Sequence, residues 1–167
     1  EIKNPKIVEV GIGSGIISVM LSKLIPSLEI IAVDINEDAL NLAKENAIKH
    51  NVEKQIKFLK SDLLTNVEGS FDMCISNPPY ISNNYVLPHN VKFEPSNALF
   101  GGEKGDELLK DLIVQVANKN IKYLYCEYGY DQKESIKNYM NSFNIKSLEF
   151  YKDYSDFDRG FLIEFKL

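Results

Sequence analysis

Residues 6–16, with the sequence KIVEVGIGSGI, join an apolar run to a glycine-rich turn. The run Lys6–Val10 is rich in β-branched residues, which favour a strand. The segment Gly15–Leu24 that follows has the length and the apolar periodicity of a helix. Glycine lacks a Cβ and therefore permits a tight turn between the two. The stretch predicts a strand, a turn and a helix, which is the opening unit of an α/β fold.

The same alternation continues along the chain. Further strands are expected at Glu29–Asp34, Ile56–Lys60, Phe71–Ser76, Ile121–Glu127, Ile145–Tyr151 and Phe161–Leu167. Further helices are expected at Glu37–His50, with Asn36 as its N-cap, at Asp106–Ala117 and at Asp131–Phe143. This order predicts a mostly parallel sheet with helices on both faces. The last two of the seven strands have no helix between them, so we expect an antiparallel C-terminal hairpin.

A long stretch without periodicity, residues 77–105, interrupts the alternation. Such a stretch would normally argue against the assignment of elements around it. It begins, however, at the carboxyl end of a strand, where open α/β sheets bind their ligands. We therefore expect it to be irregular and to form a wall of the functional site.

The glycine-rich turn supplies the first candidate cofactor-binding residues, which are Glu9, Gly11, Ile12, Gly13, Ser14 and Gly15. A turn of this kind can be purely structural, and NAD-binding proteins use the related spacing G-x-G-x-x-G. Here the third glycine comes two residues after the second. In addition, the carboxylate of Glu9 would repel a phosphate and tolerate a cationic sulfonium and ammonium. Both features favour S-adenosyl-L-methionine over NAD.

Acidic residues at two later strand ends extend this candidate site. Asp34 ends the second strand, about where a carboxylate hydrogen-bonds the hydroxyls of a ribose. Asp62 and Leu63 follow the third strand and are expected to border the adenine, with Asp62 accepting a hydrogen bond from its exocyclic amine. The alternatives are a solvated aspartate before a helix and a plain acidic loop residue.

Asn77, Pro78, Pro79 and Tyr80 directly follow the fourth strand and are the candidate catalytic residues. A planar NH2 nitrogen is a poor nucleophile because its lone pair is delocalised, but hydrogen-bond acceptors can aim it at a methyl carbon. The side chain of Asn77, which should also border the cofactor, and the carbonyl of Pro78 can be such acceptors. Two prolines restrict φ, and Tyr80 offers a flat face. The alternative is a proline turn at a strand end.

On these motifs the chain resembles the bacterial peptide chain release factor N5-glutamine methyltransferases, the HemK/PrmC family. Further segments carry the resemblance: Val91–Leu99 looks like the family's F-E-P…A-L element, Glu127–Gly129 resembles its E-x-G, and Tyr151–Arg159 is similar to its aromatic-Asp…Arg element. Leu63 departs from the family, in which an aromatic residue is common at this position.

The resemblance implies a class I S-adenosylmethionine-dependent methyltransferase with a Rossmann-like fold, and a catalytic domain over residues 1–167. It implies methyl transfer to the side-chain amide nitrogen (N5) of the glutamine in the GGQ motif of a class I release factor. That release factor is the expected partner and the cytoplasm the expected location. The family's N-terminal helical substrate-binding domain is expected to be absent from this chain.

Charge bears on the alternative functions. The Asn-Pro-Pro-Tyr motif also occurs in adenine-N6 DNA and RNA methyltransferases, and a non-catalytic binding module on the same fold is a third possibility. The net charge is −5, and Arg159 is the single arginine. Tight binding to a phosphate backbone needs clustered Lys and Arg residues. We therefore expect no stable binding to nucleic acid.

Other functional classes are disfavoured by what the sequence lacks. It has no apolar run of about 18 residues that could span a membrane, and Glu1–Pro5 contains no signal-peptide core. No metal site is expected, because His50 and His89 lie far apart and no Cys/His cluster exists. Cys74 and Cys126 lie in apolar runs and are expected to be buried free thiols on neighbouring strands.

Overall fold

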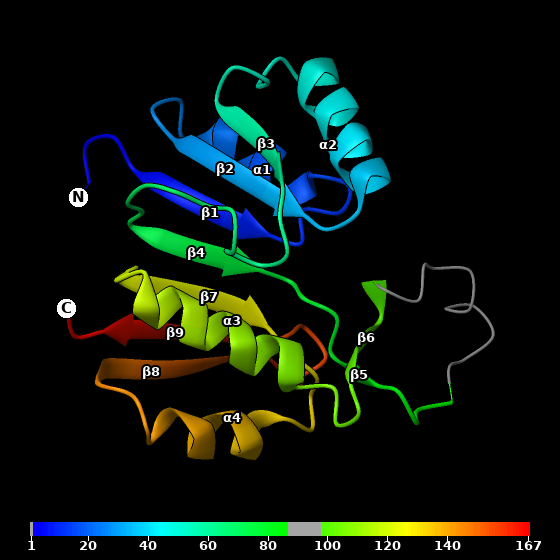
Figure 1. The fold of residues 1–167 in the computed structure, drawn as a ribbon, viewed down its shortest axis with the longest axis vertical. Coiled ribbons are helices and arrows are strands. Elements are labelled where there is room, and N and C mark those ends of the chain that lie inside the picture. Colours follow the sequence, from blue (N-terminus) through cyan, green and yellow to red (C-terminus); the bar gives the residue numbers. More distant parts are fainter. Residues whose placement is uncertain (1, 87–97) are drawn as a thin grey trace.

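A computed structural model describes residues 2–86 and 98–167, in which strands and helices alternate and build a seven-stranded sheet (Figure 1). The strands of this sheet are β1 (Lys6–Val10), β2 (Glu29–Asp34), β3 (Ile56–Lys60), β4 (Met73–Ser76), β7 (Tyr123–Glu127), β8 (Ile145–Lys152) and β9 (Asp158–Phe165). The helices are α1 (Ile16–Leu24), α2 (Glu37–Lys49), α3 (Glu107–Asn118) and α4 (Lys133–Met140). A separate parallel pair is formed by β5 (Ile81–Ser82) and β6 (Phe100–Gly102).

The strand order is β3-β2-β1-β4-β7-β9-β8. β1 pairs in parallel with both β2 and β4, so the two halves of the sheet wind outward from the boundary between β1 and β4. β9 is antiparallel to both β7 and β8. The predicted mostly parallel sheet with a C-terminal hairpin is confirmed. Ligands of such sheets bind at the carboxyl ends of the strands where the order reverses, here beyond β1 and β4.

Helices cover both faces of the sheet, because successive side chains of a strand point to opposite faces. On one face the core joins the strands to α1 and α2 through Ile7, Ile30, Val19, Leu40 and Ala43. On the other face, at the front of Figure 1, it joins them to α3 and α4 through Val8, Leu124, Phe161, Leu112 and Ile136. None of the helices in the described ranges is long and apolar enough to cross a membrane.

Several expected bounds differ by two or three residues, and two expectations about the elements need a correction. The last strand begins at Asp158 rather than at Phe161, because its hairpin partner β8 extends to Lys152, which pairs with Asp158. The stretch 77–105 is not wholly irregular, since it contains β5 and β6. The N–H of Ile81 donates to the carbonyl of Leu99 at 2.9 Å. Strands of two and three residues are too short to show a period in sequence.

The two cysteines lie on adjacent strands, Cys74 on β4 and Cys126 on β7, and both are free and fully buried, as predicted. Burial raises the pKa of each thiol well above its ordinary value. Both thiols therefore stay protonated at neutral pH and act as small apolar residues of the core.

Candidate functional site

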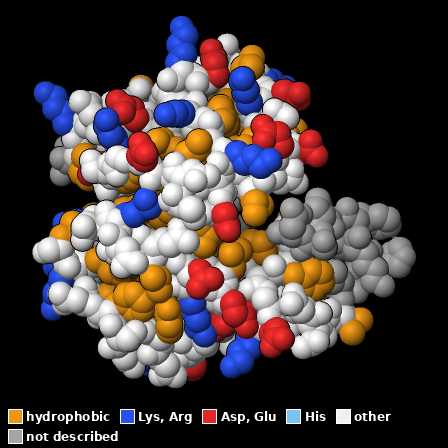
Figure 2. Space-filling model, in the orientation of Figure 1, with side chains coloured by type: hydrophobic (Ala, Val, Ile, Leu, Met, Phe, Trp, Pro, Cys, Tyr) orange, Lys and Arg blue, Asp and Glu red, His pale blue; other side chains and the backbone are white. Residues whose placement is uncertain are grey.

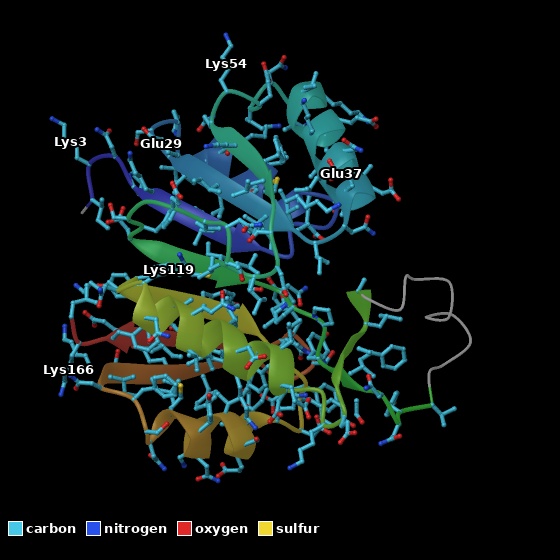
Figure 3. The ribbon with its side chains drawn as sticks, viewed as in Figure 1. Lys3, Glu29, Glu37, Lys54, Lys119 and Lys166 are labelled. Carbon is cyan, nitrogen blue, oxygen red and sulfur yellow. The ribbon has the colours of Figure 1, made fainter. Side chains whose placement is uncertain are left out.

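A cavity of about 630 Å³ opens at the carboxyl ends of β1, β2 and β4. Its lining comes from the ends of β1, β2 and β4, from the turns after β1, β2, β3 and β4, from α2 and α3, and from β6 and the residues before it: Val10, Gly11, Gly13, Ser14, Asp34, Ile35, Asn36, Asp38, Ala39, Leu42, Ser61, Asp62, Leu63, Ser76, Asn77, Pro78, Pro79, Ala98, Phe100 and Leu108. A second hollow of about 490 Å³ includes Glu29 and Lys54, at the amino-end side of the sheet (Figure 3). Because the predicted site residues lie at the other end, the first cavity is the candidate site.

The glycine-rich turn between β1 and α1 forms one wall. Gly11, Gly13 and Gly15 have φ angles of 72°, 53° and 80°, a left-handed conformation that costs a residue with a Cβ roughly 1–2 kcal/mol. The N–H of Gly11 donates to the carbonyl of Val33 at 2.9 Å. Among the described residues, no heavy atom lies within 4 Å of where a Cβ on Gly13 would stand. The turn thus leaves open space over its backbone.

Asp34, at the end of β2, is held by the turns on both sides of it. Its carboxylate accepts from the N–H of Gly13 at 3.1 Å and from the N–H of Asn36 at 2.9 Å. An ionised carboxylate has about four acceptor sites, so Asp34 retains capacity for donors in the cavity. Asn36 caps α2 as predicted, because its side chain accepts from the N–H of Asp38 at 2.9 Å.

The turn after β3 contributes Asp62 and Leu63. The N–H of Ser61 donates to the carbonyl of Asp34 at 3.1 Å, which joins this turn to the end of β2. Asp62 is exposed at the rim, whereas Leu63 is largely buried and presents an aliphatic surface to the cavity. Leu63 has a φ of 47°, which is uncommon for a residue with a Cβ. The backbone is therefore strained at a position that borders the site.

Asn77, Pro78 and Pro79 line the cavity directly after the carboxyl end of β4. The hydroxyl of Ser76 donates to the carbonyl of Val10 at 2.8 Å, which ties the end of β4 to the end of β1. The carbonyl oxygen of Asn77 lies 3.9 Å from where a Cβ on Gly11 would stand. The structure therefore brings the Asn-Pro-Pro segment and the glycine turn together across the boundary between β1 and β4.

Three other predicted site residues do not line the cavity. Ile12 belongs to the core. Gly15 packs against α2, where a Cβ on Gly15 would lie 3.0 Å from the Cβ of Ala43. Tyr80 is half-buried just beyond Pro79, and the guanidinium of Arg159 lies 5.9 Å from the centroid of its ring. Tyr80 therefore borders the outer end of the site.

Glu9 lies beneath the glycine turn and also does not line the cavity. It is 1% exposed, and its carboxyl group accepts a hydrogen bond from the hydroxyl of Ser18 on α1. Burial raises the pKa of Glu9 to about 7; the bond from Ser18 opposes this rise and nearby Asp34 adds to it. Glu9 thus joins β1 to α1 on either side of the turn.

Several lining residues were not predicted from the sequence. Ile35 and Leu42 give the β2–α2 unit an apolar surface, and their exposed fractions are 58% and 48%. Ile35 could have been predicted, because it is an apolar residue directly after Asp34 at the end of a strand. Phe100 and Leu108 reach the cavity from β6 and α3, and no local pattern marks them.

The structure describes only part of the segments that carried the resemblance. Of Val91–Leu99, residues 91–97 lie outside the described residues, Ala98 lines the cavity and Leu99 is buried. Glu127 is half-buried at the carboxyl end of β7, where burial raises its pKa and the charge of Arg159 opposes the rise.

The charge of the lining constrains the ligand. Its ionisable side chains, over the described residues, are Asp34, Asp38 and Asp62, and none of them is basic. Such a lining disfavours phosphates and favours cationic ligands. Within residues 2–86 and 98–167, no group of three His, Cys, Asp or Glu side chains is arranged to hold a metal ion.

Known proteins with similar sequences include methyltransferases. The chain is 38% identical over 157 residues to a release factor glutamine methyltransferase of Aquifex aeolicus, with 90% of this chain and 55% of that protein covered. It is 38% identical over 171 residues to one of Clostridium botulinum, with 95% and 60% covered. The chain therefore spans about half the length of the curated relatives it matches.

Solved structures share the fold. The ribosomal protein L11 methylase of Lactobacillus delbrueckii subsp. bulgaricus superposes with a TM-score of 0.69 at 24% identity, over 99% of this chain and 72% of that one. The human METTL16 catalytic domain, in complex with a MAT2A 3'UTR hairpin, gives 0.76 at 17% identity, over 98% and 65%. A family model described as the methyltransferase small domain matches residues 1–92. The chain therefore belongs to the methyltransferase small domain family.

Proposed function

We propose that this chain is the catalytic domain of an S-adenosyl-L-methionine-dependent protein-(glutamine-N5) methyltransferase, which acts on the GGQ glutamine of class I release factors. One observation carries the proposal: the glycine turn and the Asn77–Pro79 segment face the same cavity. A methyl donor and a planar NH2 group can react only when both are held in one such space. The similarity to release factor glutamine methyltransferases over 90–95% of the chain supports this substrate.

The described lining suits the cofactor. When bound, S-adenosylmethionine supplies an electrophilic methyl group on a positively charged sulfur. Gly13 and its neighbours would allow close approach to the backbone, and Asp34 would accept hydrogen bonds from the ribose hydroxyls. Leu63 and Ile35 offer apolar surface to the adenine, with Asp62 at the rim for its amine. The lack of basic residues in the described lining disfavours the two phosphates of NAD.

Asn77 and its neighbours would orient the substrate. The side-chain carbonyl of Asn77 and the backbone carbonyl of Pro78 accept from the NH2 group and direct the nitrogen at the methyl carbon. In the transfer the nitrogen would gain the methyl group, the cofactor would leave with a neutral sulfur, and one N–H proton would pass to solvent water. Fixed carbonyl dipoles stabilise the positive charge that develops on nitrogen without reorganising. Tyr80 would supply a flat surface at the outer end.

A glutamine on a protein loop fits the surface better than a nucleobase. Acidic and basic side chains are interspersed on the face in Figure 2 rather than separated by sign, and the net charge of −5 opposes binding to a phosphate backbone. A duplex base must also be flipped out at a cost of a few kcal/mol. The proposed substrate works in the cytoplasm, and so would the enzyme.

This chain covers 55–60% of the length of the two release factor glutamine methyltransferases, and we assign part of the release-factor contacts to a helical substrate-binding domain in the part that it does not cover. Residues 1–167 alone should therefore bind the cofactor nearly normally. They should methylate release factor less efficiently than a protein that carries both domains.

The test compares labelled-methyl incorporation into a class I release factor, its GGQ-glutamine-to-alanine variant and DNA at one salt concentration. We expect incorporation into the wild-type release factor alone. Incorporation into DNA would favour an adenine-N6 methyltransferase instead, and equal labelling of both release factors would exclude the glutamine.

A further inference from the structure

The backbone that leaves the cavity after Pro79 is enclosed by a later segment of the chain. A Cβ on Gly101 would lie 2.3 Å from the carbonyl oxygen of Pro79, and one on Gly105 would lie 2.5 Å from that of Tyr80. Both distances are too short for any side chain, so the backbone at positions 101 and 105 packs directly on these two carbonyls. The N–H of Ile81 is bonded to the carbonyl of Leu99. These contacts constrain the backbone of residues 79–81 on the side that faces away from the cavity.

Gln132, at the N-cap of α4, supplies a polar contact to the same segment. Its side-chain N–H donates to the carbonyl of Tyr80 at 2.8 Å, and its side-chain oxygen accepts from the N–H of Gly129 at 2.9 Å. Gln132 is 7% exposed. Because both ends of the amide are engaged, the side chain has one defined orientation. It connects the β7–α4 turn to a carbonyl 52 residues earlier.

We propose that Gln132 is a positioning residue, which holds the Asn77–Tyr80 segment in the geometry that binds the substrate NH2 group. The inference rests on the proposed function, because it concerns the same site. Gln132 does not line the cavity, so it acts through the backbone of Tyr80. A displacement of about 1 Å in a reacting geometry can cost about 10²-fold in rate. A buried hydrogen bond to the neighbouring carbonyl is therefore expected to affect turnover.

Two substitutions separate the hydrogen bonds of Gln132. Gln132→Met has a similar volume and removes both bonds. Gln132→Glu retains an acceptor for Gly129 but, when ionised, cannot donate to Tyr80. Ile136→Val is the control for stability, since Ile136 is fully buried one helical turn further along α4 and its truncation destabilises by removing a methyl group from the core.

The first measurement is steady-state methylation of release factor beside the thermal midpoint of each variant. We expect both Gln132 variants to lower kcat by about 10- to 100-fold, with KM for release factor and for S-adenosylmethionine within about threefold of wild type. Ile136→Val should lower the midpoint and leave kcat within about threefold. Unchanged kcat in the Gln132 variants, or an equal loss in Ile136→Val, would overturn the positioning role.

The second measurement does not depend on the substrate. The amide of Ile81 should exchange hydrogen about tenfold faster in Gln132→Met, because one hydrogen bond of the enclosure is lost, and at the wild-type rate in Ile136→Val. If the wild-type protein fails to methylate release factor, the proposed function is rejected. The hydrogen exchange rate of the Ile81 amide then tests whether Gln132 holds the Asn77–Tyr80 segment. An unchanged exchange rate in Gln132→Met would overturn that role.

Discussion

Two walls of the cavity are built in different ways: the proposed cofactor wall, which is the glycine turn with Asp34, and the proposed substrate wall, which is the Asn77–Tyr80 segment. On the cofactor wall, contacts join consecutive strand–turn units: the N–H of Gly13 reaches Asp34 over 21 residues, and Asn36 caps the helix it precedes. On the substrate wall, Tyr80 is bonded to Gln132 over 52 residues. The cofactor wall can thus form as soon as neighbouring parallel strands pair. The substrate wall needs the second half of the chain to be folded around it.

This difference implies that the two walls can be perturbed separately. Changes on the cofactor wall should act on ligand affinity or on the stability of the β1–α1 unit. Changes on the substrate wall should act on turnover with little change in cofactor affinity.

The largest effect is expected for Asn77→Ala. Turnover should fall by about 10²–10³-fold, because a group that stabilises the transition state is lost, while cofactor affinity stays within about tenfold. Methyl transfer and calorimetric binding are measured on the same preparation, with Asn118→Ala on the exposed end of α3 as the control. Turnover within a few-fold of wild type would remove Asn77 from the mechanism.

The next effect concerns Glu9 and the stability of the cofactor wall. Its pKa is raised from 4.5 to about 7, so the folded state keeps a proton that the unfolded state releases between these values. The contribution of Glu9 to the free energy of unfolding is therefore fully present below about pH 4.5. It is lost as the pH rises through about 7, which lowers the free energy of unfolding by about 3 kcal/mol. Glu9→Gln should remove this decline, since glutamine stays neutral.

Urea unfolding of wild type and Glu9→Gln at pH 5 and pH 8 measures this decline. Glu45→Gln, at an exposed position of α2, is the matched control for loss of a carboxylate. An identical pH dependence in wild type and Glu9→Gln would show that the burial of Glu9 does not penalise its charge.

Asp34→Ala should weaken S-adenosylmethionine binding by roughly 1–3 kcal/mol, the scale for losing a charge-assisted hydrogen-bond partner. The N–H of Gly13 also loses its acceptor, which should lower the stability of the glycine turn. Calorimetry on this variant and on Asp111→Ala, at an exposed position of α3, makes the comparison. Equal affinity for the two variants would place the ribose away from Asp34.

The smallest effect distinguishes ligand contact from backbone strain. Gly13 and Gly69 both have positive φ and open space around them, so alanine at either position should cost roughly 1–2 kcal/mol of stability. Gly13→Ala should in addition lower cofactor affinity by about tenfold, or about 1.4 kcal/mol, because the methyl group enters the cavity. Equal affinities of the two variants would contradict a cofactor seated on the glycine turn.

The parallel core and the turns at the ends of β1, β2 and β3 could be predicted from the sequence alone. The bounds of β1, β2 and β3 agree with those predicted, since each strand is a run rich in apolar residues that ends at a turn. The position of Asp34 beside the glycine turn follows from parallel pairing of β1 and β2, because that pairing brings their carboxyl ends to the same edge. Local periodicity and turn chemistry are sufficient for features of this kind.

The contacts that hold the Asn77–Tyr80 segment could not be predicted from the sequence. The bond from Gln132 to Tyr80 spans 52 residues, β5 and β6 are too short to show a period in sequence, and no local pattern marks Phe100 as a lining residue. Glu9 was expected in the cofactor site, but its burial against α1 places it beneath the turn and outside the cavity lining. The pattern of polar and apolar residues predicts which face of a helix or strand is buried. Which distant carbonyl meets a given amide depends on the packed backbone, because such a hydrogen bond requires atoms within about 3 Å.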